Sequence, residues 1–411
     1  MTESRVDSGY AWVRLVAAMV IGTIGGVGMW SPVVVVPAVQ AEFGIARADA
    51  ALPYTLTMIG FVFGTVLMGR LADKRGITTP LLIATVVMSA GYAAASFASN
   101  VWIFAIISGI AIAMLGSAAL FAPLLADTSL WFEKRRGLAI ALCASGNYVA
   151  GTIWPPVLEH FIAEVGWRQT HLYTGLFCLV TMLPLALILR PKPPLLKPAT
   201  EAAAAAGFLR PLGLHPNVIQ ACIVIMGLCC CVAMSMPQVH IVAYCVDLGY
   251  GPARGAEMLS LMLGFGIISR LASGYILDRI GGLKTLLLGS TLQMLALALY
   301  LPFDGLMSLY IISAVFGLVQ GGIVPSYAFI VRELFPAGQA GFRVSLAISS
   351  TLAGMALGGW MSGRIYDLTG SYQAALLNGI AFNLVNVLIA VWLLTRQSGL
   401  RRVAGATVSA A

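Results

Sequence analysis

The sequence predicts an all-α membrane protein with twelve transmembrane helices in two pseudo-symmetric six-helix bundles. Three observations predict it: the composition, the spacing of the apolar stretches and an internal repeat. Of the 411 residues, 59% are hydrophobic and 10% are charged, whereas a soluble domain carries about 25% charged residues. Because so little charge cannot cover a water-facing surface of this size, we expect most of the surface to face lipid.

Apolar stretches long enough to cross a bilayer, about 20 residues each, follow one another along the chain. In lipid every backbone polar group must be paired, so stretches of this length are expected to be helices and not barrel strands. The expected spans lie near 13–38, 48–69, 80–98, 102–127, 138–162, 171–190, 217–246, 257–277, 285–303, 308–331, 344–366 and 373–395.

A proline-rich stretch separates the first six spans from the last six. Residues 191–216 read PKPPLLKPATEAAAAAGFLRPLGLHP, and the early prolines cannot continue a helix. We therefore expect an N-terminal six-helix bundle over 1–190, a cytoplasmic linker over 191–216 and a C-terminal six-helix bundle over 217–411.

The basic residues predict the orientation. All but five of the 24 Lys and Arg residues lie near the termini, in the linker or in the loops after even-numbered spans, and positive loops stay cytoplasmic. The exceptions are Arg47, Arg168, Arg254 and Arg364 on the opposite side and Arg270 inside a span. Both termini are therefore expected in the cytoplasm. The formal charge of +8 is a topology signal, so no nucleic-acid partner is expected.

The two sets of spans also repeat each other in sequence. Pro32, Gly44, Gly69, Asp73 and Gly76 recur as Pro237, Gly249, Gly274, Asp278 and Gly281, each displaced by 205 positions. Because each half has an even number of spans, the repeats are parallel and share an axis along the membrane normal. This symmetry places a cavity between the halves near mid-membrane and favours two mobile halves over a channel or a membrane enzyme.

At these residues the chain resembles the major facilitator superfamily. The loop signature between spans 2 and 3 and its degenerate copy between spans 8 and 9 comprise Gly69, Asp73, Lys74, Arg75, Gly76, Gly274, Asp278 and Arg279. The resemblance implies the superfamily's twelve-helix fold and a cytoplasmic charge network that latches the halves when that side is closed. The alternative is a solvated basic turn that only sets topology.

Shorter patches resemble narrower groups. Residues 7–12 and 131–139 resemble two motifs of monocarboxylate transporters, and Arg270 through Asp278 resembles span 8 of the related bacterial oxalate:formate antiporters. The resemblance implies a bacterial monocarboxylate transporter-like protein of the inner (plasma) membrane.

Arg270 is predicted deep inside span 8. At 1.5 Å per residue it lies roughly 20 Å from one edge of the span and roughly 12 Å from the other. An arginine at this depth costs at least about 2.5–3.5 kcal/mol, and no acidic residue stands three or four positions away. Since a guanidinium fits a carboxylate bidentately, we expect a cargo carboxylate as its partner, the role that the resemblance also implies. A structural arginine bonded to carbonyls and hydroxyls is the alternative.

The number of buried cations indicates how many carboxylates the cargo carries. By resemblance, oxalate-type carriers use a second basic residue in span 11, but residues 344–351 contain none. One cation favours one carboxylate, as in lactate or pyruvate. Further substrate-binding candidates, each of which can instead be structural, are Gln320, Tyr327, Asn147, Tyr148 and His240.

These features predict a secondary active transporter of small monocarboxylates that works by alternating access, with proton symport as the first hypothesis. Anion exchange stays open, because Val33 after Pro32 and Gly266 before Arg270 do not match the proton-handling positions of animal monocarboxylate transporters. Efflux of an amphipathic drug or metabolite and a transporter-like receptor that senses a carboxylate are two further hypotheses. We expect a functional monomer that is not an enzyme, with no cofactor and no metal, since the seven cysteines lack metal spacing.

Overall fold

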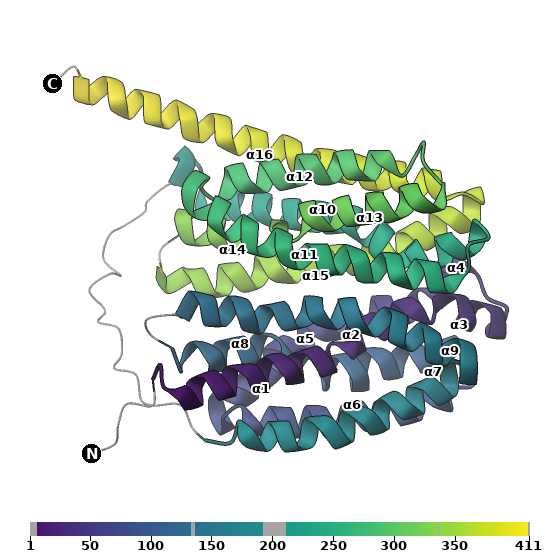
Figure 1. Cartoon of the computed structure of the whole chain (residues 1–411). Helices are drawn as coiled ribbons and strands as arrows, with labels where there is room; N and C mark the ends of the chain where they lie inside the picture. The colour runs from purple at the N-terminus through teal and green to yellow at the C-terminus, as the bar shows by residue number, and fades with distance from the viewer. Residues whose placement is uncertain (1–5, 133–135, 192–210, 336, 410–411) are drawn as a thin grey trace, which may run out of the picture.

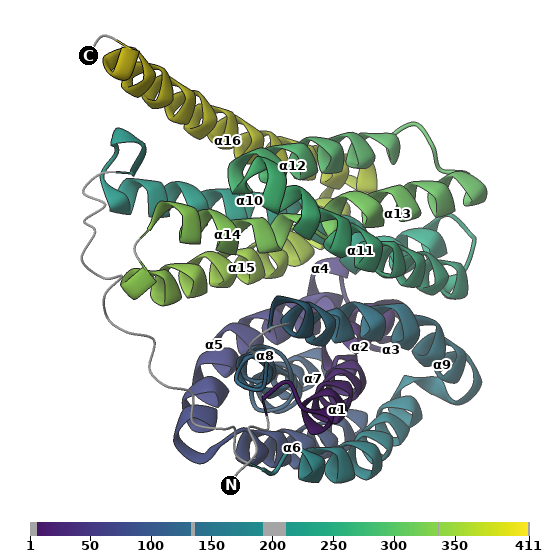
Figure 2. The ribbon, with the colours of Figure 1, turned by 60° about the vertical axis from the view of Figure 1, so that its left-hand side comes forward.

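The computed structural model describes residues 6–132, 136–191, 211–335 and 337–409, and every regular element in these ranges is a helix. The helices form an N bundle (α1–α9) and a C bundle (α10–α16) that lie side by side (Figures 1 and 2). Helix α1 begins and helix α16 ends at the same end of the molecule, at the left in Figure 1. We call this end the terminus side and the opposite end, which carries α4, the far side.

Short helices and three long ones build the N bundle. Their bounds are α1 Gly9–Gly25, α2 Val27–Val34, α3 Val36–Phe43, α4 Arg47–Ala50, α5 Leu52–Arg75, α6 Thr78–Ser96, α7 Val101–Ile107, a π-helical turn Ser108–Met114, a 3-10 turn Ser117–Leu120, α8 Ala122–Ser129 and α9 Arg136–Ile188.

The C bundle follows a 3-10 turn at Pro211–Gly213. Its helices are α10 Pro216–Asp247, α11 Pro252–Ile280, α12 Gly282–Leu299, α13 Leu306–Gln320, α14 Ile323–Leu334, α15 Ala337–Thr369 and α16 Tyr372–Ser409. The start of α10 agrees with the end expected for the linker. Most of the linker (192–210) lies outside the described residues, so the domain boundaries stay a prediction.

Among the described residues, eleven helical stretches are long and apolar enough to cross a membrane. One of them, Leu142–Ile188, has 47 residues and covers most of two expected spans, 138–162 and 171–190. Gly166 divides it with φ 80° and ψ 159°, a conformation that glycine adopts more easily than any other residue. The twelve-span, all-α fold class is therefore confirmed, with spans 5 and 6 joined by a sharp turn at Gly166.

The regular α-helical hydrogen bonding of the fourth and tenth expected spans is interrupted near their middles. Span 4 passes from α7 through the π-helical and 3-10 turns to α8, and span 10 is interrupted at Gly321 and Gly322 between α13 and α14. Gly116, at the first break, and Gly321 are themselves 205 positions apart. Interrupted helices at corresponding places of two repeats are typical of carrier binding sites near mid-membrane.

Side chains of the N bundle enter the hydrophobic core of the C bundle. Met29, Trp30, Val33, Tyr54 and Met58 pack in one continuous cluster with buried residues of α10 and α11. A separate cluster fills the interior of the N bundle. The two bundles therefore share apolar packing in addition to the polar contacts described below.

Candidate functional site

Arg270 of α11 is half-buried and held loosely. Its Nε donates to the carbonyl oxygen of Gly321 at 3.4 Å, and its Nη2 donates to the hydroxyl oxygen of Tyr148 at 3.5 Å. Both distances exceed the usual range of about 2.7–3.2 Å for such bonds. Most of the hydrogen-bonding capacity of this guanidinium is therefore unspent on the described protein groups.

Tyr148 covers Arg270 from the other bundle. The guanidinium carbon lies 4.3 Å from the centre of the Tyr148 ring, within the range of an attractive cation–π contact. Gly266, one turn before Arg270, makes room for the ring, because a Cβ at this position would overlap the ring carbons. Gly266 and Tyr148 thus place an aromatic face of α9 directly over a cation of α11.

Among the described residues, no carboxylate lies within ion-pair distance of Arg270. Other basic residues of this part of the chain do have acidic partners, such as Arg14 with Asp127 at 2.7 Å and Arg47 with Asp247 at 2.9 Å. The acidic neighbour that would make Arg270 a structural ion pair is thus missing from the described part of the chain.

The break in span 10 lies against Arg270. The backbone N–H of Gly321 donates to Ser269 Oγ at 3.1 Å, and a Cβ on Gly321 would lie 2.9 Å from the backbone nitrogen of Arg270. The absence of a side chain at Gly321 allows this close approach, and its carbonyl oxygen accepts the hydrogen bond from Arg270 Nε. The break was not predicted from the sequence, although the Gly321-Gly322 pair and its match to Gly116 signalled it.

Gln320 and Asn147 lie beside these groups in the chain. Gln320 is fully buried next to Gly321; its Oε1 accepts a hydrogen bond from Gln238 at 2.6 Å, and its Nε2 has no partner among the described residues. The side-chain amide nitrogen of Asn147, next to Tyr148, contacts the sulfur of Met29 at 3.7 Å, and Asn147 lines a small hollow of the N bundle.

Tyr327 and His240 make their contacts elsewhere. The Tyr327 hydroxyl is fully buried and contacts the carbonyl of Met226 at 3.0 Å and Asn386 Oδ1 at 3.3 Å. Both ring nitrogens of His240 are engaged, by Tyr372 at 3.2 Å and by the carbonyl of Gly359 at 2.7 Å. The structure therefore brings Arg270 and Tyr148 together but leaves Tyr327 and His240 inside the C bundle.

The repeated loop signature lies on the terminus side. Gly76 (φ 79°) and its counterpart Gly281 (φ 82°) end α5 and α11. The signature glycines Gly69 and Gly274 have open space around them. Lys74, Arg75 and Arg279 are exposed, and Arg279 stacks on Tyr275. The side chains of Asp73 and Asp278 lie outside the described part of the structure, so the charge network stays a prediction.

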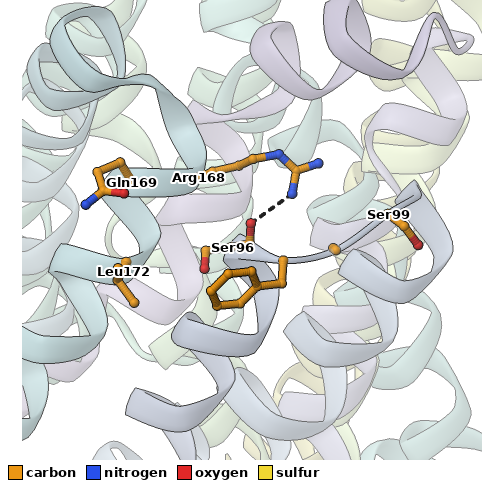
Figure 3. A pocket seen from close by; sticks show the side chains of 7 residues that line it. Ser96, Ser99, Arg168, Gln169 and Leu172 are labelled. Carbon is orange, nitrogen blue, oxygen red and sulfur yellow. Dashed lines mark hydrogen bonds between the residues drawn. The ribbon is translucent and has the colours of Figure 1, made fainter.

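A larger hollow on the far side, of about 460 Å³, is lined by residues 96–99, Arg168, Gln169 and Leu172. Figure 3 shows the Arg168 guanidinium reaching the carbonyl of Ser96, at 2.8 Å. Its Nε and Nη2 bind Glu42 at 3.0 and 2.7 Å. The charge of Arg168 is thus neutralised by a carboxylate, and the hollow offers no uncompensated cation to an anionic ligand.

Comparison with known proteins gives the same general picture. A family profile described as Major Facilitator Superfamily matches residues 18–313 and 271–409. Monocarboxylate transporter 13 of Rattus norvegicus is 26% identical over 399 residues, which cover 92% of this chain and 87% of the relative. The MFS-type transporter opdF of Penicillium oxalicum is 23% identical over 87% of this chain and 83% of its own length.

Among solved structures, a bacterial homologue of the human lysosomal transporter Spinster, in an inward-facing and unoccupied conformation, superposes with a TM-score of 0.73. It is 14% identical, and the match covers 96% of this chain and 98% of the other. At this identity the likeness shows the fold alone.

Proposed function

Because the chain belongs to the major facilitator superfamily, we propose that it is a secondary active transporter of small monocarboxylate anions, such as lactate or pyruvate, and that Arg270 binds their carboxylate. Its distant similarity to a monocarboxylate transporter, at 26% identity, supports this class of cargo. The membrane-spanning fold and the absence of enzyme chemistry follow from the family; the cargo is the proposed part.

The observation that carries the proposal is the underused guanidinium of Arg270. Its two contacts, at 3.4 and 3.5 Å, leave room for a stronger acceptor, and a carboxylate is the acceptor that fits its planar fork best. A charge-assisted bond of this kind is shorter, about 2.7–2.9 Å, so an incoming carboxylate competes effectively with both contacts.

Tyr148 gives this binding step a link to movement. Its ring belongs to the N bundle, whereas Arg270 and Gly321 belong to the C bundle. A carboxylate that takes the place of the Tyr148 hydroxyl weakens one contact between the bundles and adds its own. The cargo can therefore change the relative stability of the two arrangements of the bundles, which alternating access requires.

We also propose that the terminus side faces the cytoplasm of a bacterial inner membrane. The predominance of Lys and Arg in the loops on that side supports this orientation. The far side, where Arg47 binds the C bundle, is then the outer side. In this orientation the contacts at Arg47 close the pathway toward the outside.

The test is uptake of labelled lactate and pyruvate into proteoliposomes that contain the full chain. We expect uptake with the unaltered protein and its loss with Arg270→Ala. Arg396→Ala is the matched control, since Arg396 of α16 also stacks on an aromatic ring, that of Trp392, but is exposed. Uptake that survives Arg270→Ala would overturn the assignment of Arg270. Uptake of neither acid by the unaltered protein would overturn the cargo class.

The same vesicles separate symport from exchange. A proton gradient without internal substrate drives uptake by a symporter, whereas an exchanger requires an internal anion. Preferential uptake of dicarboxylates such as oxalate would replace the monocarboxylate assignment with the oxalate-type one.

A further inference from the structure

One side chain of the N bundle joins three helices of the C bundle at the far side. Arg47, the first residue of α4, is buried; its Nη2 donates to Asp247 at the end of α10 at 2.9 Å, and its Nη1 donates to the Tyr372 hydroxyl at the start of α16 at 3.1 Å. The guanidinium also lies 4.8 Å from the ring centre of Tyr366 in α15.

The carboxylate of Asp367 adds two bonds between the same bundles. It accepts the backbone N–H groups of Arg47 and Ala48, both at 2.8 Å. Gly363 lets the helices come this close, because a Cβ there would lie 2.9 Å from the Cα of Ala48. We call Arg47, Asp247, Asp367 and Tyr372 the far-side latch.

Arg47 itself does not titrate under any condition in which the protein works. Burial alone would lower the pKa of its guanidinium, but the nearby Tyr372 and Asp247 groups outweigh burial, and the net pKa is raised. Any response of the latch to mild changes in pH must therefore come from a different group.

His240 of α10 is that group, since it is fully buried directly behind Tyr372. Its Nε2 lies 2.7 Å from the carbonyl of Gly359; a carbonyl can only accept, so Nε2 carries a proton. In the neutral ring Nδ1 is then an acceptor, and Tyr372, at 3.2 Å, donates to it. A continuous chain of donors therefore runs from Arg47 through Tyr372 and His240 to Gly359.

Protonation of His240 breaks this chain. Nδ1 becomes a donor, so the Tyr372 oxygen faces N–H groups from two cations, Arg47 and His240, and its own proton loses its acceptor. The other charged or titratable groups around this pair are Asp367 and Tyr366 of α15 and Asp247 and Tyr244 of α10. Both carboxylates are already engaged, with Arg47 and the start of α4, and a second buried positive charge draws them away from these partners.

We propose that the far-side latch is the outer gate of the transport cycle and that protonation of His240 opens it. The gate rests on the proposed function for its orientation and use, but its opening by protons can be measured without any cargo. His240 would then supply the proton coupling that the span-1 and span-8 positions of this chain lack. External protons would favour the conformation that receives cargo from outside.

The experiment measures the distance between spin labels at Ser99→Cys and Asp304→Cys, two exposed positions on the far side of different bundles. Cys222 is replaced by Ser, and the other native cysteines are buried. Distances are recorded in nanodiscs without cargo at about pH 5.5 and about pH 8, on either side of the ordinary pKa that an imidazole released from burial would have.

We expect a larger fraction of long distances at the lower pH. His240→Gln, which keeps a neutral hydrogen-bonding side chain, removes this pH response, whereas His160→Gln, a change at an exposed histidine of α9, keeps it. Tyr372→Phe provides a second variant that removes the link without touching the imidazole, and it too loses the response. A pH response that persists in His240→Gln or in Tyr372→Phe, or that is missing from the unaltered protein, overturns the proposal. If the unaltered protein shows the pH response but takes up no lactate, the result counts against the proposed cargo and not against the gate.

Discussion

Arg47 and Arg270 are both withdrawn from bulk water, yet the protein treats them in opposite ways. Arg47 binds a carboxylate and a hydroxyl at 2.9 and 3.1 Å, and its backbone N–H binds a second carboxylate at 2.8 Å. Arg270 has a carbonyl at 3.4 Å and a hydroxyl at 3.5 Å. This contrast supports the two proposals that Arg47 holds a conformation and that Arg270 binds a ligand.

The largest effect is expected from a change of Arg270 that keeps its charge. Arg270→Lys retains one positive charge but loses the planar fork that matches a carboxylate. We expect the efficiency of lactate uptake to fall about a hundredfold or more, since each tenfold loss corresponds to about 1.4 kcal/mol. Initial rates over a range of lactate concentrations measure it, and an unchanged efficiency would mean that charge alone suffices.

The next largest effect concerns the contacts of Arg47 and is expected when one negative charge is removed from the far-side latch. Asp367→Asn keeps the shape of the side chain but weakens its bonds to the two N–H groups of α4. Hydrogen bonds to charged groups contribute about 1.5–3 kcal/mol, so we expect the far side to open in a larger fraction of molecules. The spin-label distances measure this fraction. Asp49→Asn, in the same short helix, is the control; an equal effect of both changes would show that the latch position has no special role.

A smaller effect is expected from a substitution that displaces the Tyr148 ring from Arg270 but leaves Tyr148 itself in place. In Gly266→Ala the added methyl overlaps the Tyr148 ring, and relief of such overpacking typically costs about 1–3 kcal/mol. We expect lower thermal stability and an altered affinity for cargo. Gly264→Ala, two residues earlier, is the matched control, because its methyl would meet Thr152 at an ordinary 3.5 Å. Equal thermal stability and equal cargo affinity in the two variants would contradict the close packing of the Tyr148 ring against Gly266.

The smallest effect is expected at the exposed pair of Glu42 and Arg168. The hydrogen bond from Arg168 is the main reason why the pKa of Glu42 is lowered, against a smaller effect of burial. A lowered pKa stabilises the folded state above the unfolded value of about 4.3, and this stabilisation is lost as the pH falls below it. Glu42→Gln should therefore cost about 0–1 kcal/mol near neutral pH and nothing in acid. A thermal-unfolding series over pH measures it, and an equal loss at every pH would contradict the assignment.

Much of the fold could be predicted because lipid imposes a simple rule on the sequence. Spans must be long and apolar, so their number and the repeat could be recognised from composition and spacing. The exact ends of the spans could not be predicted. For example, spans 5 and 6 lie in one helical element, α9, which turns sharply at Gly166. The interruption at Gly321 was also missed, since it depends on close contact with Ser269 and Arg270 of another helix.

The position of Arg270 inside a span could be predicted, because a charge stands in a long apolar stretch there; its role as a binding residue stays a prediction. Its contact with Tyr148 joins residues 122 positions apart, yet both residues stood among the candidates because of their depth. The far-side latch was missed, because Arg47 and Asp367 are 320 positions apart and each resembles an ordinary loop charge. The signal that could have found it is a pair of aspartates, Asp247 and Asp367, on the side of the membrane that has few basic residues.

Ligand-dependent thermal stability shows without a transport assay whether the unsatisfied guanidinium of Arg270 binds a single carboxylate. A ligand that binds the folded state raises the unfolding temperature by an amount set by its affinity and concentration. We predict that short monocarboxylates stabilise the purified protein more than dicarboxylates do, and that Arg270→Gln loses this stabilisation. Stabilisation that is equal in Arg270→Gln, or greater with dicarboxylates, would contradict the proposed role of Arg270.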